Sequence, residues 1–144
     1  MPQSRRSSLS SQPDLTSSIL VRTSERYQAA ERVRRDRGAA WMARQPVDSP
    51  AHGAVRLLIG TWDALARSYV VEGSAHDQFF AINPFDLAWA ALGPAIDILR
   101  KTDGAMFAGE FEKLSKRSKV WLGTPAGRRY RSKGNGGQGG GLFL

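Results

Sequence analysis

The chain has 144 residues, no cysteine and a formal net charge of +8, which allows one domain of ordinary size. The lack of cysteine excludes disulfides, thiolate metal sites and cysteine nucleophiles. The charge lies at the ends: residues 1–50 and 123–144 each carry a net +4, while residues 51–122 hold eight basic and eight acidic residues. A polyanionic partner should therefore meet the termini first.

Both ends of the chain have the composition of disordered segments. Residues 1–18 are rich in Ser and Arg, and residues 123–144 contain eight of the fifteen glycines. We therefore expect a disordered Ser/Arg-rich tail over 1–18 and a disordered, basic, Gly-rich tail over 123–144.

Residues 19–48 are predicted to form a basic helical arm. Ala, Glu and Arg give residues 19–44 a high helix propensity, although Gly38 weakens the middle and the apolar face is poor. Two alternatives stay open for this arm. It either docks on the rest of the protein through Tyr27 and Trp41, or it projects away.

Residues 49–122 are predicted to be a helical core domain. A helix over 55–71, entered at Pro50, is indicated by apolar residues at alternating spacings of three and four: Val55, Leu58, Trp62, Leu65 and Tyr69. Asp63 and Arg67 should form an ion pair on the solvent-exposed face of this helix. A short helix of about 74–81, opened by a capping box at Ser74, should fill the gap between the longer helices with Phe79 and Phe80.

The most apolar stretch is FFAINPFDLAWAALGPAIDILRK, residues 79–101. Two carboxylates and two prolines within it argue against a membrane span. A second stripe indicates a core helix instead, with Trp89 central: Phe85, Trp89, Leu92, Ile96 and Leu99. Asn83 is expected to be its N-cap, Asp86 its capping-box acid, and Pro94 the cause of a kink near residues 90–93.

The last predicted helix covers residues 104–122. Phe107, Phe111, Leu114 and Trp121 mark its inner face, and Glu112 should pair with Lys116. No segment shows the alternation of a strand. The sequence therefore predicts an all-α fold, a small antiparallel bundle of four to five helices with short connections and disordered basic tails.

Two apolar frames in the core resemble one known family. These are W-x-x-L-x-P-x-I with a following Arg100, in WAALGPAIDILRK, and F-x-x-x-F-E-K-L at residues 107–114. Together they resemble an uncharacterised bacterial family, a domain of unknown function whose members are short helical proteins, many with one N-terminal membrane helix. The resemblance covers roughly half of the chain and implies a helical architecture but no activity. This chain has no membrane helix before its arm, and its Gly-rich tail is outside the resemblance.

The polar residues give no pattern typical of an enzyme or a metal site. His52 and His76 lack a metal-ligand spacing and are expected to be solvated turn residues. Asp63, Asp86 and Asp97 are expected on polar helix faces. GNGGQGGG is not a phosphate loop, because no strand precedes it and no helix follows it. We expect no catalytic residue, no cofactor and no metal.

These observations predict a non-catalytic, soluble helical interaction module in the cytoplasm, with another protein as its partner and no transmembrane segment. The alternative is weak, sequence-independent binding of RNA or DNA through the basic termini. The contacts would come from the tail residues Arg128, Arg129, Tyr130, Arg131 and Lys133.

Overall fold

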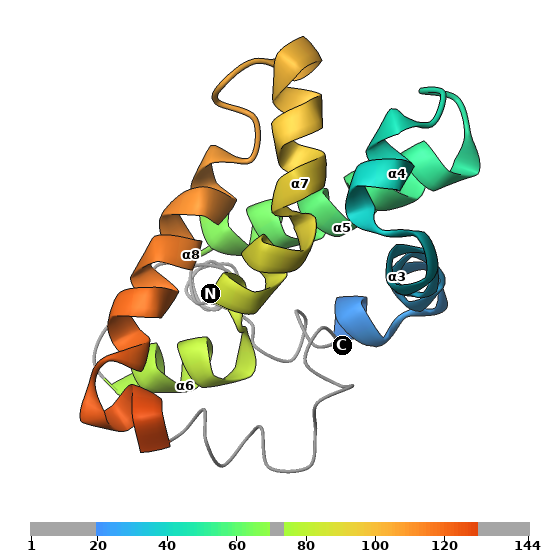
Figure 1. Cartoon of the computed structure of the whole chain (residues 1–144). Coiled ribbons are helices and arrows are strands. Elements are labelled where there is room, and N and C mark those ends of the chain that lie inside the picture. The colour runs from blue at the N-terminus through green and yellow to red at the C-terminus, as the bar shows by residue number, and fades with distance from the viewer. Residues whose placement is uncertain (1–19, 70–73, 130–144) are drawn as a thin grey trace, which may run out of the picture.

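The computed structural model describes residues 20–69 and 74–129, and in these residues every regular element is a helix (Figure 1). The predicted all-α class is therefore confirmed. The elements are α3 (Glu25–Arg37), α4 (Ala39–Arg44), α5 (Pro50–Arg67), α6 (Ser74–Ile82), α7 (Phe85–Asp103) and α8 (Gly109–Leu122). The tail over 1–18 and residues 130–144 lie outside the described part.

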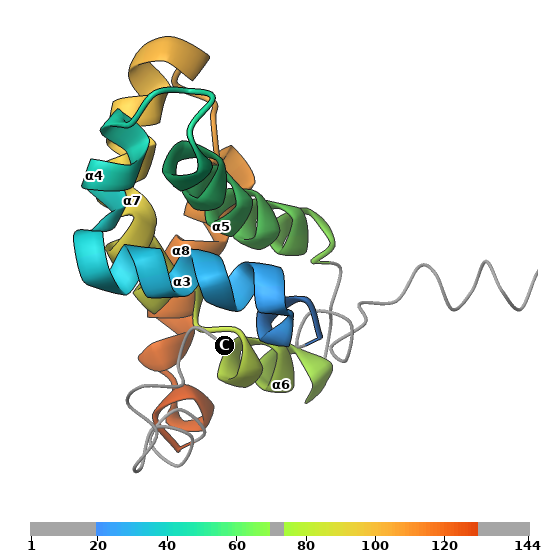
Figure 2. The same cartoon turned by 90° about the vertical axis from the view of Figure 1, so that its right-hand side faces the viewer.

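The helices form two pairs that cross. α7 and α8 contact each other and lie side by side in Figure 1, joined by a turn at one end. α3 and α5 also contact each other, and in Figure 2 both run across the direction of α7 and α8. A single antiparallel bundle is therefore not confirmed.

The core is centred on Trp62 of α5, whose side chain is fully buried. Its ring packs edge-on against Phe85 and stacks on Phe111, with centroid distances of 5.2 and 6.0 Å. Most of the predicted stripe positions are buried, which confirms the helical periodicity of α5, α7 and α8. Around Trp62, the largest apolar side chains with no exposed surface come from five helices: Met42, Val55, Leu58, Phe79, Phe80, Phe85, Ile96 and Phe111.

The N-terminal arm docks on this core. Tyr27 of α3 is buried and accepts a hydrogen bond from Trp62 Nε1 at 2.9 Å. The prediction of a single helix over residues 19–44 is wrong, because the helix is interrupted at Ser24 and at Gly38. Ser24 caps α3 by accepting from the Tyr27 N–H. Gly38 has φ +90°, a conformation that favours glycine, and this turn allows α4 to pack against α7.

Burial gives Tyr27 a testable pH dependence. It raises the Tyr27 pKa to about 12 from 10.0, against the opposing effect of the Trp62 hydrogen bond. Because the folded pKa is the higher one, this contribution to stability is complete below pH 10 and is lost as pH rises toward 12. We expect the ultraviolet absorbance of tyrosinate to contain a component near pH 12 that Tyr27→Phe removes. Complete titration near pH 10 in the folded protein would contradict the burial of Tyr27.

The entry to α7 differs from the expectation. Asn83 is buried and does not cap the helix; its Nδ2 donates to the Phe79 carbonyl at 3.0 Å, and its Oδ1 accepts from Arg22 at 2.7 Å. Asp86 accepts from Ser118 Oγ of α8 at 2.9 Å instead of completing a capping box. α7 continues through Pro94, and the kink near residues 90–93 stays a prediction.

The turn between α7 and α8 also differs, since α8 begins at Gly109 and not near residue 104. Gly104 and Ala108 both have positive φ, at 100° and 61°, so residues 105–108 leave the helix. Arg100 holds this turn by donating to the Phe107 carbonyl at 2.9 Å and to Glu112 at 2.8 Å. That hydrogen bond lowers the pKa of Glu112.

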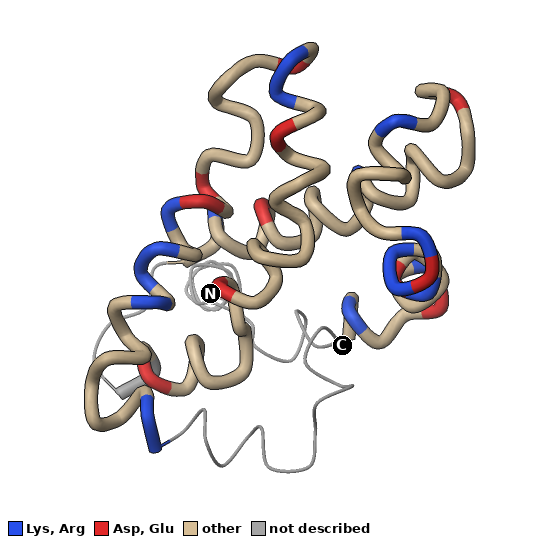
Figure 3. The backbone as a smooth tube through the Cα atoms, viewed as in Figure 1, with Lys and Arg blue, Asp and Glu red and all other residues tan. Residues whose placement is uncertain are grey.

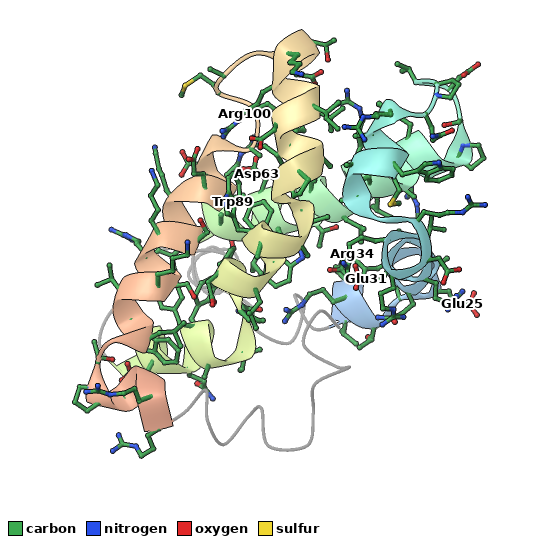
Figure 4. The ribbon with its side chains drawn as sticks, in the orientation of Figure 1. Glu25, Glu31, Arg34, Asp63, Trp89 and Arg100 are labelled. Atoms are coloured by element: carbon green, nitrogen blue, oxygen red, sulfur yellow. The ribbon has the colours of Figure 1, made fainter. Side chains whose placement is uncertain are left out.

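Trp89 is only half-buried, which corrects its expected central position. Its ring contacts Phe111 on one side, and the Arg100 guanidinium lies 5.6 Å from its centroid. Figure 4 shows Trp89, Arg100 and Asp63 gathered where α5, α7 and α8 meet.

No single helix of the described segments has both the length and the apolar character needed to cross a membrane. α6 and α7 meet those criteria only when taken together, as a pair bent by 48°.

Candidate interaction groove between α3, α4 and α5

An open groove of about 640 Å³ lies between α3, α4 and the first half of α5. Five of its twelve lining residues are small: Ala29 and Ala30 from α3, and Ala51, Gly53 and Ala54 from α5. A Cβ added at Gly53 would meet no atom within 4 Å. Larger apolar side chains, one from each of the three helices, complete the lining: Val33, Trp41 and Leu57. The groove therefore offers an apolar surface with open space above Gly53 of α5.

Charged side chains lie at the rim of this groove. Arg26, Asp36 and Arg37 line it, which leaves one positive charge in excess. The Arg37 guanidinium lies 4.8 Å from the centroid of the half-buried Trp41 ring, a cation–π contact that fixes both side chains. On the same helix, Glu31 is buried and forms an ion pair with Arg34 (Figure 4).

His52 fixes α4 to the start of α5. Ser49 caps α5 and Pro50 begins it, so His52 falls in the first turn facing the end of α4. Its Nδ1 lies 3.2 Å from the Ala43 carbonyl and 3.1 Å from that of Gln45, while Nε2 accepts from Arg56 at 2.8 Å. These partners define an Nδ1–H tautomer. His52 is therefore a buried helical residue, which corrects the expectation of a solvated turn residue.

Arg56 continues this network to α7. Besides contacting His52, it forms two hydrogen bonds to the Asp103 carboxylate, at 2.8 and 3.1 Å. The bond from Arg56 lowers the pKa of Asp103. A chain of polar contacts therefore connects α4, α5 and α7 beside the groove.

The other titratable side chains form structural contacts. Asp63 is buried, which corrects its expected position on a wet face, although its predicted ion pair with Arg67 is present at 2.7 Å. His76 is half-buried and bonded to the Tyr69 hydroxyl, whose pKa burial raises. Asp97 is exposed. Across residues 20–69 and 74–129, no group of three His, Asp or Glu side chains could hold a metal ion.

The residues predicted to contact nucleic acid are described only in part. Arg128 and Arg129 are exposed, on a helical turn over residues 125–129 that follows α8. This turn belongs to the segment expected to be disordered. Gly127 packs against the Trp121 carbonyl so closely that a Cβ would lie 2.0 Å from its oxygen. Tyr130, Arg131 and Lys133 lie outside the described residues.

The comparisons with known proteins are negative: no family model matches the chain, and no curated protein or solved structure does so either.

The groove itself was not predicted. Its only signal in the sequence is the presence of small residues on both helices, Ala29 and Ala30 in one and Ala51, Gly53 and Ala54 in the other. Such residues carry little hydrophobic signal, and their pattern does not show that two helices place them face to face.

Proposed function

We propose that this protein is a non-catalytic helical interaction module that binds a helix of another protein in the groove between α3, α4 and α5. The observation that carries the proposal is the open groove itself, which is lined by small residues of α3 and α5 together with the half-buried Trp41. Small side chains permit close approach of a partner's backbone, and a half-buried tryptophan is a typical anchor at protein interfaces.

The chemistry of the partner follows from the lining. An amphipathic helix fits a groove between two helices when its apolar residues recur every three or four positions. The contact face should carry apolar side chains, because apolar residues of all three helices, among them Trp41, Ala54 and Leu57, line the groove. Acidic residues on its flank would complement Arg26 and Arg37 at the rim. The cytoplasmic location stays a prediction, and so does the relation to the uncharacterised helical family that the sequence resembles.

Two glycines of α5 provide a matched pair of variants for the test. Gly53 lies in the groove, and Gly60 lies two turns further along α5, outside the residues that line it. Both are exposed, and a Cβ at either would meet no atom within 4 Å. Replacing a helical glycine by leucine should stabilise each variant by about 0.5–1 kcal/mol.

We expect Gly53→Leu to abolish partner binding, because its side chain fills the groove, while Gly60→Leu binds as the wild type does. The measurement is quantitative cross-linking and affinity capture from nuclease-treated native lysate with all three proteins. Proteins captured by the wild type and Gly60→Leu but lost with Gly53→Leu would support the groove. Equal capture by both variants would overturn it.

A further inference from the structure

α8 presents a basic face to solvent. Its apolar residues Phe111, Leu114 and Trp121 are buried against the domain, whereas four cations on the opposite side are exposed: Lys113, Lys116, Arg117 and Lys119. Figure 3 shows that Lys and Arg positions recur along α8 as blue segments.

Residues 51–122 are neutral in sum, but their basic and acidic residues are unevenly distributed along the chain. Residues 51–108 carry four basic and six acidic residues, a net −2, whereas residues 109–122 carry four basic and two acidic residues, a net +2. Arg128 and Arg129 follow on the turn after α8. A basic surface is thus built into the fold, although residues 51–122 are neutral in sum.

A hollow of about 440 Å³ lies between the end of α5 and α8, and four cations line it: Arg67, Lys113, Lys116 and Arg117. The Arg117 guanidinium lies 5.3 Å from the centroid of the Tyr69 ring, within the range of a cation–π contact. Lys113 and Lys116 pair with Glu110 and Glu112 at 3.1 and 3.7 Å, but their side chains are 67% and 75% exposed. Such exposed pairs are worth little and exchange readily for another anion.

We infer that α8 and the turn after it bind the phosphodiester backbone of a single-stranded nucleic acid without reading its sequence. A row of exposed cations on one rigid helix fits a polymer with a negative charge at every unit. The alternative of an anionic membrane surface is disfavoured, because Val120 is the one large apolar side chain exposed on α8. Surface-bound helices need a broad apolar face to insert.

This surface is distinct from the groove, since it comes from α8 and the end of α5. The nucleic-acid contact that the sequence predicts at the basic termini is thereby proposed for the exposed face of α8 and for Arg128 and Arg129.

Counterion release predicts a measurable salt dependence for this binding. The logarithm of affinity falls linearly with the logarithm of salt concentration, with a slope of about 0.7 for each phosphate neutralised on a single strand. Removing three lysines of α8 should therefore reduce the slope by about 2 if each contacts one phosphate.

The test uses the full chain and a labelled oligouridylate, with binding followed by fluorescence anisotropy over a salt series. Lys113→Gln/Lys116→Gln/Lys119→Gln removes the cations of α8. Arg32→Gln/Arg35→Gln/Lys101→Gln removes the same number of exposed cations from α3 and α7, so that the two variants have equal net charge. Lys116→Gln alone, with an expected slope change of about 0.7, replaces the triple variant if the latter melts early.

We expect the α8 variant to lose about 2 units of slope, the control variant to keep the wild-type slope, and vesicles of phosphatidylserine and phosphatidylcholine not to compete. Equal losses of slope in the two variants would mean that binding depends only on net charge, and this result would overturn the inference. Absence of binding by the wild type at low salt, or full competition by the vesicles, would overturn it too.

Discussion

Trp62→Ala should lower the free energy of unfolding by roughly 3–5 kcal/mol, the range for truncating a buried aromatic residue. The side chain has no exposed surface, and its ring is enclosed by Phe85, Phe111 and the Arg22 guanidinium, which lies 4.9 Å from the ring centroid. Truncation would leave a cavity where α3, α5, α7 and α8 meet. It would also leave the Tyr27 hydroxyl without its donor.

Trp89→Ala is the matched comparison for this prediction. The two residues are the same size, but Trp89 is half-buried and lies at the edge of the core beside Arg100. We expect it to cost about 1.5–3 kcal/mol, the scale of apolar burial without a large internal cavity. Urea unfolding of both variants measures the difference. Equal losses would mean that the core is not centred on Trp62.

The helical stripes could be predicted because burial imposes a period on the sequence. Val55, Leu58 and Trp62 follow one face of α5, and Leu92, Ile96 and Leu99 follow one face of α7. Spacings of three and four residues are sufficient to identify such faces. Which tryptophan lies at the centre was not predictable, since Trp62 and Trp89 both lie within the apolar stripe of their helix.

The polar contacts could not be predicted because their partners are distant in sequence. Asn83 is a sound N-cap by its local sequence, yet its amide bonds to Arg22, 61 residues away. His52 precedes Gly53, and the local sequence indicates a turn. In the structure, Ser49 and Pro50 start a helix there, so that the His52 ring faces backbone carbonyls of the preceding segment. Local sequence rules are overridden where tertiary contacts offer a buried polar group its partners.

The start of α8 depends on the same kind of distant contact. Ala108 occupies the N-cap position and provides no side-chain hydrogen bond. Asp63 of α5 takes that role: its Oδ1 accepts from the Phe111 N–H at 2.9 Å, while its Oδ2 pairs with Arg67 at 2.7 Å. A carboxylate at this position also interacts favourably with the positive end of the helix dipole. One side chain therefore joins α5 to the first turn of α8.

Asp63→Ala should accordingly cost about 1–3 kcal/mol of unfolding free energy, the penalty for leaving a buried N–H without an acceptor. Asp63→Asn should recover most of this loss, because its Oδ1 can still accept from Phe111. Arg67→Ala should cost less than about 1 kcal/mol, since the Arg67 side chain is 70% exposed and its ion pair is a surface one.

Urea unfolding of the three variants separates the two roles of the carboxylate. If Arg67→Ala is as costly as Asp63→Ala, the ion pair stabilises the fold and the contact with α8 does not. If Asp63→Asn is as costly as Asp63→Ala, the charge is needed as well as the acceptor. A loss confined to Asp63→Ala would establish that α8 is capped from α5.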